Sequence, residues 1–140
     1  MANETSGLFE MKPHHVGISV PDLEASIAWY CDVLGFTVVR LGYIQEAHTK
    51  NAYLKHGDFY VELFQPDNPI PLPDDRLYPT KDVSTFGTKH IAFEVKDLRK
   101  VTEILKKKGI DIAMERPDGT VHFIRDNSGI LLEFMPPLYP

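Results

Sequence analysis

The sequence has very little cysteine and no long apolar run. Cys31 is the single cysteine in 140 residues, which rules out an intrachain disulfide and argues against a cysteine-based zinc site. No stretch approaches the roughly 20 apolar residues that cross a bilayer. Residues 1–12 also lack the basic and apolar regions of a signal peptide. These absences predict a cytoplasmic protein that does not enter a membrane.

Positive charge is also scarce. The chain carries 15 Lys and Arg against 20 Asp and Glu, for a net charge of -5. Its short basic run, Lys106 to Lys108, ends a predicted helix, where cations suit the helix dipole. Because no basic stripe could follow a phosphate backbone, we do not expect a nucleic-acid partner. A chain of this length is expected to form its own hydrophobic core.

What the sequence does contain is an internal repeat, which is a strong guide to architecture. Residues 14–36 align with residues 89–110, and residues 51–66 align with residues 120–137. Each half has the pattern of one strand, one helix and three further strands. The sequence therefore predicts an α+β fold built from two βαβββ modules.

The first strand and helix of each half have clear local signals. Val16, Ile18 and Val20 alternate with His15, which predicts a strand with one buried face. Asp22 and Asp97 are placed to cap the two helices, and Gly35 and Gly109 to end them. The remaining strands are predicted at residues 37–44, 51–55 and 59–65 of the first half and 111–114, 120–125 and 130–135 of the second.

A proline-rich segment joins the two halves. It contains Pro66, Pro69, Pro71, Pro73 and Pro79, and we predict that it forms neither helix nor central strand. A connection of this length is often a lid or binding loop, although a plain surface crossover fits equally well. The expected organisation is a polar leader at 1–12, a first module at 13–66, a linker at 67–87 and a second module at 88–136.

Two histidines and two glutamates occupy matched positions in the repeat. His15 and His90 begin the first strands on the face opposite the predicted core, whereas Glu62 and Glu133 stand among apolar residues of the last strands. The neighbours of His15 on that face, Gly17 and Ser19, are small and leave room for a cavity over it. A buried carboxylate needs a cation or hydrogen bonds, and His and carboxylate sets suit divalent metals.

Each of these four residues also has an ordinary structural explanation when taken alone. His15 could be a satisfied strand histidine, and Glu62 could lie on the solvent face of an edge strand. The matched occurrence in both halves favours a metal site instead. We therefore predict one divalent ion, Co, Ni, Zn, Mn or Mg, with His15, Glu62, His90 and Glu133 as its ligands.

The repeat with these residues resembles the vicinal-oxygen-chelate superfamily, which includes glyoxalase I, methylmalonyl-CoA epimerase, fosfomycin-resistance transferases and extradiol dioxygenases. The matching motifs are His15-Val16-Gly17-Ile18-Ser19-Val20-Pro21-Asp22, Val61-Glu62-Leu63, Lys89-His90-Ile91-Ala92 and Gly129-Ile130-Leu131-Leu132-Glu133. The resemblance implies a cupped mixed sheet around the metal, a small-molecule substrate and a homodimer.

Details of the motifs favour the isomerase branch of this superfamily, closest to methylmalonyl-CoA epimerase and glyoxalase I. The dioxygenases and fosfomycin enzymes lack the fourth ligand that Glu62 supplies here. Ser19 stands where glyoxalase I carries a glutathione-binding Arg, which argues against a glutathione substrate. Residues 35–63 most resemble methylmalonyl-CoA epimerase, whose acid/base Glu corresponds to Glu46. The shorter stretch at residues 116–120 argues against a CoA thioester.

The leading hypothesis is a metal-dependent isomerase, epimerase or lyase that needs no organic cofactor. It would move a proton through a metal-stabilised enediolate of a small oxo or hydroxy-carbonyl substrate. Glu46 and Glu133 would form the acid/base pair, with Glu62 as the substitute. Tyr43, Tyr53 and His122 are candidate pocket residues, although a one-residue register slip would reverse their facing.

Two alternatives stay open. The first is a ring-cleaving or related dioxygenase with Fe(II) held by the facial triad His15, His90 and Glu133. The second is a non-catalytic protein that sequesters a ligand, as in bleomycin resistance. Glu62 separates the first alternative from the leading hypothesis, because a facial triad does not use it.

Overall fold

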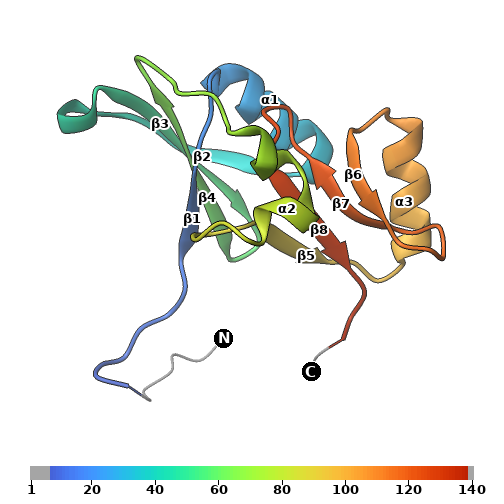
Figure 1. Cartoon of the computed structure of the whole chain (residues 1–140). Coiled ribbons are helices and arrows are strands. Elements are labelled where there is room, and N and C mark those ends of the chain that lie inside the picture. Colours follow the sequence, from blue (N-terminus) through green and yellow to red (C-terminus); the bar gives the residue numbers. More distant parts are fainter. Residues whose placement is uncertain (1–6, 139–140) are drawn as a thin grey trace. The chain divides into compact units, whose positions relative to one another are not determined.

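The structure is a computed structural model that describes residues 7–138, shown in Figure 1. Residues 1–6 of the predicted leader lie outside the described residues. The chain divides into two compact units, which we call unit 1 (Met1–Pro69) and unit 2 (Ile70–Pro140). Among residues 7–138, none of the helices has the length and apolar composition of a membrane span.

Unit 1 has the predicted βαβββ order. Its elements are β1 (His15–Ser19), α1 (Leu23–Leu34), β2 (Thr37–Ile44), the 3-10 helix η1 (Gln45–Ala47), β3 (Thr49–His56) and β4 (Phe59–Pro66). The strand order is β1-β4-β3-β2, with β1 parallel to β4 and the other neighbours antiparallel. The mixed sheet therefore places β4 in its interior.

The signals that define α1 act as predicted. The Asp22 side chain accepts a hydrogen bond from the Ala25 backbone N–H at 3.1 Å. Gly35 ends the helix with φ 74, the left-handed conformation that glycine tolerates best. Tyr30 is fully buried, and Ile18 and Val20 of the first strand segment are also buried. The apolar face of β1 thus belongs to the core, as the alternation indicates.

Space beside Gly17 is not empty, contrary to our expectation of a cavity there. A Cβ atom built on Gly17 would lie 2.9 Å from the Phe64 ring. The Phe64 side chain therefore covers this part of the sheet face. The absence of a side chain at Gly17 allows the Phe64 ring to approach the backbone closely.

Unit 2 repeats the arrangement of unit 1. Its strands and main helix are β5 (Ile91–Glu94), α3 (Leu98–Lys107), β6 (Ile112–Glu115), β7 (Val121–Arg125) and β8 (Leu131–Met135). The strand order β5-β8-β7-β6 matches that of unit 1. Asp97 caps α3 by accepting from the Lys100 N–H at 3.1 Å. The α+β prediction of two βαβββ modules is confirmed.

The proline-rich segment contains helical turns, so our prediction of no helix there was wrong. It includes the 3-10 helix η2 (Asp74–Leu77) and a short helix α2 (Pro79–Asp82). Pro79 stands in the first turn of α2, where the missing N–H costs nothing and the fixed φ suits a helix. Proline here starts a helical turn rather than preventing one.

Ionic and hydrogen bonds hold this segment within unit 2. The buried carboxylate of Asp82 pairs with Arg76 and with Lys89, whose Nζ lies 3.2 Å from Oδ1. Arg125 Nε donates to the Leu77 carbonyl at 2.9 Å. The segment is therefore anchored at several points between residue 76 and the start of β5.

Candidate metal centre

In unit 1, strands β1 and β4 bring the predicted ligands His15 and Glu62 together; we call such a His–Glu pair within one unit a half-site of the predicted metal centre. Gly17 pairs with Glu62 in the parallel register, and His15 lies on the same face two residues earlier because side chains alternate along a strand. The His15 Nε2 atom is 3.3 Å from Glu62 Oε1. Glu62 is only 8% exposed and sits on the interior strand β4, which excludes the edge-strand interpretation.

The second carboxylate oxygen of Glu62 is held by β3. Asn51 Nδ2 donates to Glu62 Oε2 at 2.8 Å. Tyr53 lies directly opposite Glu62 in the antiparallel register. Burial raises the pKa of the Tyr53 phenol, and its hydrogen bond to Glu62 and the negative charge there raise it further. Two neutral donors, Asn51 and Tyr53, therefore hydrogen-bond this buried carboxylate.

The His15 ring is fixed by neighbouring rings. Its Nδ1 atom lies 2.9 Å from Nδ1 of His14, and the His14 ring stacks on Tyr60 with centroids 4.6 Å apart. The Tyr53 ring meets His15 edge-on at 5.3 Å. With Nδ1 occupied by His14, the Nε2 atom of His15 is the nitrogen that points toward Glu62.

Unit 2 contains the equivalent half-site. His90 immediately precedes β5, and its Nε2 atom is 3.0 Å from Glu133 Oε1. Glu133 pairs with Ala92 in the parallel β5–β8 register, as Glu62 pairs with Gly17 in unit 1. His122 Nε2 lies 2.8 Å from the other carboxylate oxygen, Glu133 Oε2. One carboxylate thus contacts two imidazoles.

A β-bulge turns His122 toward Glu133. In the β6–β7 register Met114 pairs with Phe123 and Glu115 pairs with Val121, which leaves His122 as the extra residue. A bulge can place two consecutive side chains on one face. Phe123 pairs with Glu133 across β7–β8, so both Phe123 and His122 lie on the Glu133 side. Sequence alternation alone could not reveal this.

The three candidate pocket residues therefore have different outcomes. Tyr53 and His122 both lie beside a half-site glutamate. Tyr43 pairs with Lys50, one residue away from the Gly42–Asn51 pair. Because Asn51 faces Glu62, Tyr43 faces the opposite side of the sheet, and its prediction as a pocket residue was wrong.

Glu46 lies in the exposed 3-10 helix η1 at the turn between β2 and β3. Thr49, which begins β3, pairs with Pro66 at the end of β4. Glu62 precedes Pro66 by four residues on β4, so about 13 Å of strand separates the two at roughly 3.3 Å per residue. The structure does not bring Glu46 to the His15–Glu62 pair, and its catalytic role stays a prediction.

The donor chemistry of both half-sites fits a divalent ion. Zinc ligands lie about 2.0–2.2 Å from the metal, so neighbouring donors on one ion stand roughly 3 Å apart, close to the two N–O distances given above. Among the described residues, no group of three or more His, Cys, Asp or Glu side chains is arranged to hold a metal ion. Each unit thus contains one His–Glu pair, and the four-residue ligand set stays a prediction.

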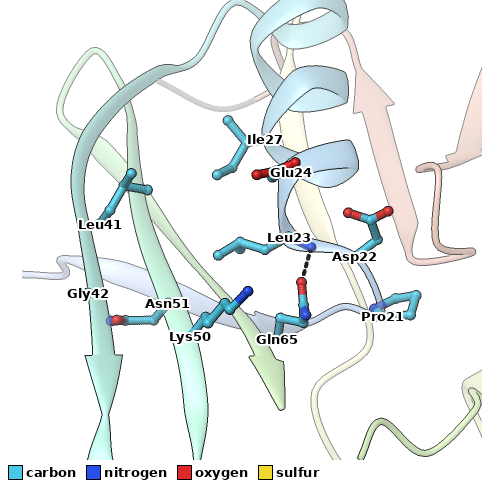
Figure 2. A pocket seen from close by; sticks show the side chains of 10 residues that line it. All are labelled: Pro21, Asp22, Leu23, Glu24, Ile27, Leu41, Gly42, Lys50, Asn51 and Gln65. Carbon is cyan, nitrogen blue, oxygen red and sulfur yellow. Dashed lines mark hydrogen bonds between the residues drawn. The ribbon is translucent and has the colours of Figure 1, made fainter. Parts of the chain in front are cut away.

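A separate cavity of about 560 Å³ lies in unit 1 beside the start of α1. Leu23 and Gln65 are among its lining residues, and the dashed line in Figure 2 marks the hydrogen bond that the Leu23 N–H donates to Gln65 Oε1 at 2.7 Å. Lys50 also lines it and pairs with Gln65. Asn51, which donates to Glu62, also lines the cavity, whereas His15 and Glu62 do not. The cavity is therefore separate from the His15–Glu62 pair.

Comparison with known proteins gives consistent relationships. The profile of the Glyoxalase/Bleomycin resistance protein/Dioxygenase superfamily matches residues 12–134. Human mitochondrial methylmalonyl-CoA epimerase is 31% identical over 130 residues, covering 86% of this chain and 70% of that protein. YaeR of Escherichia coli strain K12 is 30% identical over 125 residues, covering 86% and 92%.

Solved structures agree with these sequence matches. Glyoxalase I of Leishmania major superposes with a TM-score of 0.71 at 25% identity, covering 90% of this chain and 86% of that chain. The repeated sheets and their matched His–Glu pairs therefore occur in a fold that known enzymes share.

Proposed function

This chain belongs to the Glyoxalase/Bleomycin resistance protein/Dioxygenase superfamily, and from that premise we propose that it is a divalent-metal-dependent isomerase or epimerase. The substrate would be a small oxo or hydroxy-carbonyl compound. The observation that carries this proposal is the repeated pair of His Nε2 and Glu Oε1 atoms, 3.3 Å apart in unit 1 and 3.0 Å apart in unit 2.

The environment of Glu62 supports a four-residue ligand set. This carboxylate is nearly buried, lies beside His15 and accepts from Asn51. A facial triad of two His and one carboxylate would have no use for a second carboxylate held in this way. His15, Glu62, His90 and Glu133 would therefore bind one ion together, from one chain or from two copies in a homodimer.

Glu133 is our candidate for the proton-transfer group. The ion, when bound, would polarise the substrate carbonyl and lower the cost of charge on it. A Glu133 oxygen would accept the proton from the adjacent carbon. In an isomerisation Glu133 would return it to a neighbouring carbon, and in an epimerisation Glu46 would give a proton to the opposite face of the same carbon, with no net change in atoms or electrons. Its side chain is 19% exposed, so it is accessible while mostly shielded from water.

An epimerase-type reaction also agrees with the sequence relatives. Methylmalonyl-CoA epimerases of mouse and human are 32% and 31% identical to this chain. Epimerisation requires a proton to leave and return at a carbon next to a carbonyl group, which is the chemistry that a carboxylate base beside a metal ion provides.

Hydrogen exchange with solvent tests this proposal. The protein would be loaded separately with Co, Ni, Mn, Zn or Mg and incubated in D₂O with 2-oxo acids, 2-hydroxy ketones and acyl thioesters. We expect deuterium to enter the carbon next to the carbonyl of at least one class. The measurement is proton NMR or mass spectrometry, and the absence of exchange in every metal-loaded sample would contradict the proposal.

Two substitutions separate the candidate bases. Glu133→Gln is expected to abolish exchange and to weaken metal binding, because Glu133 serves both roles. Glu46→Gln is expected to abolish exchange while leaving the metal bound, if Glu46 is the second acid/base group. Full exchange by the Glu46 variant would remove that residue from the mechanism. Oxygen consumption with Fe(II) would instead favour the dioxygenase alternative.

A further inference from the structure

In both half-sites the two oxygens of the glutamate have different partners. Oε1 lies beside the Nε2 atom of the predicted ligand histidine, and Oε2 is held by a side chain from the adjacent strand. We propose that Asn51 and His122 are positioning residues that hold Oε2 and leave Oε1 for the ion. This inference rests on the proposed metal site.

The unit 1 contact depends on a local adaptation of the strands. Asn51 Nδ2 donates to Glu62 Oε2 at 2.8 Å. The amide oxygen of Asn51 points toward Gly42, where an added Cβ would lie only 2.8 Å away. Gly42 therefore provides the space in which Asn51 adopts this orientation. An ionised carboxylate only accepts hydrogen bonds, so the amide nitrogen is the donor.

The unit 2 contact depends on a different adaptation. His122 reaches Glu133 because it is the extra residue of the bulge in β7, and its Nε2 atom lies 2.8 Å from Oε2. Without the bulge its side chain would face the opposite side of the sheet. Two different backbone arrangements thus place a donor beside the equivalent oxygen, Oε2, of Glu62 in unit 1 and Glu133 in unit 2.

This shared outcome indicates that the position of the donor matters. Side chains that hold metal ligands from behind fix their orientation, and their loss typically weakens metal binding by about 10–100-fold. Neither donor is required to carry charge in this role. An amide at Asn51 and an imidazole N–H at His122 are equivalent, because each supplies one hydrogen bond to Oε2.

Cobalt titration of the full-length protein tests the role of His122. His122→Phe keeps a ring of similar size but removes the donor, and we expect Co²⁺ affinity to fall by about 10–100-fold with a changed visible absorption spectrum. His122→Gln keeps an N–H donor and should recover most of the affinity and the original spectrum. His56→Gln, an exposed histidine at the end of β3, is the matched control.

The corresponding change in unit 1 is Asn51→Leu, which keeps the size of the side chain and removes its donor. We expect a similar loss of Co²⁺ affinity, with Asn68→Leu on the exposed segment after β4 as the control. Thermal unfolding of the metal-free variants establishes that each is folded, because a global loss of structure would abolish a cooperative transition.

The outcomes distinguish this inference from the proposed function. If the unsubstituted protein binds no Co²⁺, the metal proposal and this inference are both overturned. If it binds Co²⁺ and His122→Phe and Asn51→Leu bind it equally well, only the positioning role is overturned. Equal losses in His122→Phe and His122→Gln would also overturn it for His122, since packing and not the hydrogen bond would then be responsible.

Discussion

The buried Glu62 shows how strongly a single residue can depend on its surroundings. Glu62 is 8% exposed and engages His15 through one oxygen and Asn51 through the other. A buried carboxylate is expensive unless hydrogen bonds or a cation compensate its lost hydration. The sequence shows the carboxylate, but the residues that compensate for it are separated from it along the chain and emerge only from strand register.

Gly42 offers a direct test of this arrangement. In Gly42→Ala the new Cβ would stand 2.8 Å from the Asn51 amide oxygen, so we expect the Asn51 side chain to move and release Glu62. The expected loss of unfolding free energy is about 1.5–3 kcal/mol, the value of a hydrogen bond to a charged group. Urea unfolding measures it.

A double-substitution cycle identifies the cause of any loss at Gly42. In the Asn51→Ala background the obstructing amide is gone, so Gly42→Ala should have little further effect if the two residues are coupled. Equal losses in both backgrounds would show that the extra methyl group disturbs β2 itself and that Asn51 is not involved.

Asp118 gives a residue-scale prediction about pH. Hydrogen bonds from the Thr120 side chain and backbone N–H lower the pKa of Asp118. A carboxyl whose folded-state pKa is lowered stabilises the fold above its unfolded pKa, and this contribution is lost as pH falls through the folded value. Asp118→Asn should therefore be less stable than the original protein at neutral pH, and the difference should shrink in acid.

Urea unfolding from about pH 7 to about pH 3 spans the ordinary range of Asp titration and measures this difference. The Asn side chain keeps an oxygen that can accept from Thr120. The comparison therefore measures the effect of the negative charge with little change in side-chain shape. A difference that does not change with pH would contradict the assigned cause. A difference that grows in acid would reverse the predicted sign.

At the scale of elements, local signals predicted helices and strands better than they predicted side-chain facing. Asp22 and Asp97 cap helices as expected, because an N-cap depends on only a few neighbouring residues. The bulge at His122 depends on the register between β6 and β7, which the sequence does not encode locally. Alternation therefore could not settle the facing of His122.

The proline-rich segment illustrates a second limit at this scale. Proline content suggested a segment without helix, yet Pro79 begins α2 and Asp82 is buried at its end. The choice depends on where proline falls within a turn, since the first turn accepts it and later turns do not. Contacts of Asp82 with Arg76 and Lys89 then hold the segment.

Asp82→Asn tests whether this segment supports the metal site. The substitution leaves two cations around a neutral side chain, and removing one partner of a fully buried pair costs about 3–5 kcal/mol. Arg76 and Lys89 are 31% and 22% exposed, so solvent reduces the expected loss to about 2 kcal/mol. Urea unfolding measures it.

Metal binding provides the second measurement for Asp82. Lys89 Nζ contacts both Asp82 and the Thr85 carbonyl, and Lys89 directly precedes His90. We therefore expect Asp82→Asn to weaken Co²⁺ binding as well as stability. Lys81→Gln, a neighbouring exposed residue, is the control. Reduced stability with unchanged Co²⁺ affinity would show that the segment does not position His90.

At the scale of the whole molecule, the internal repeat was the most informative feature of the sequence. Two similar halves predicted two similar units, and both units have the same strand order. Each unit also places one His beside one Glu. A repeat does not specify whether the two His–Glu pairs that would bind one ion come from the same chain or from two copies, because either combination supplies the same four side chains.

Metal stoichiometry tests whether the half-sites act together. If His15, Glu62, His90 and Glu133 share one ion, the protein should bind one Co²⁺ per chain, and removing either histidine should abolish tight binding. Two ions per chain would show that each half-site works independently. A bound ion should also raise the free energy of unfolding, by about 2.7 kcal/mol when the free Co²⁺ concentration is 100 times the dissociation constant.

Mixing two inactive variants then locates the shared site. One variant lacks the unit 1 donors through His15→Ala and Glu62→Ala, and the other lacks the unit 2 donors through His90→Ala and Glu133→Ala. In a site built between copies, a mixed dimer regains one complete set of four donors, so Co²⁺ binding should return on mixing. In a site built within each chain, neither partner can supply a complete set and mixing restores nothing. Co²⁺ binding before and after subunit exchange therefore distinguishes the two assemblies, with each variant alone as the control.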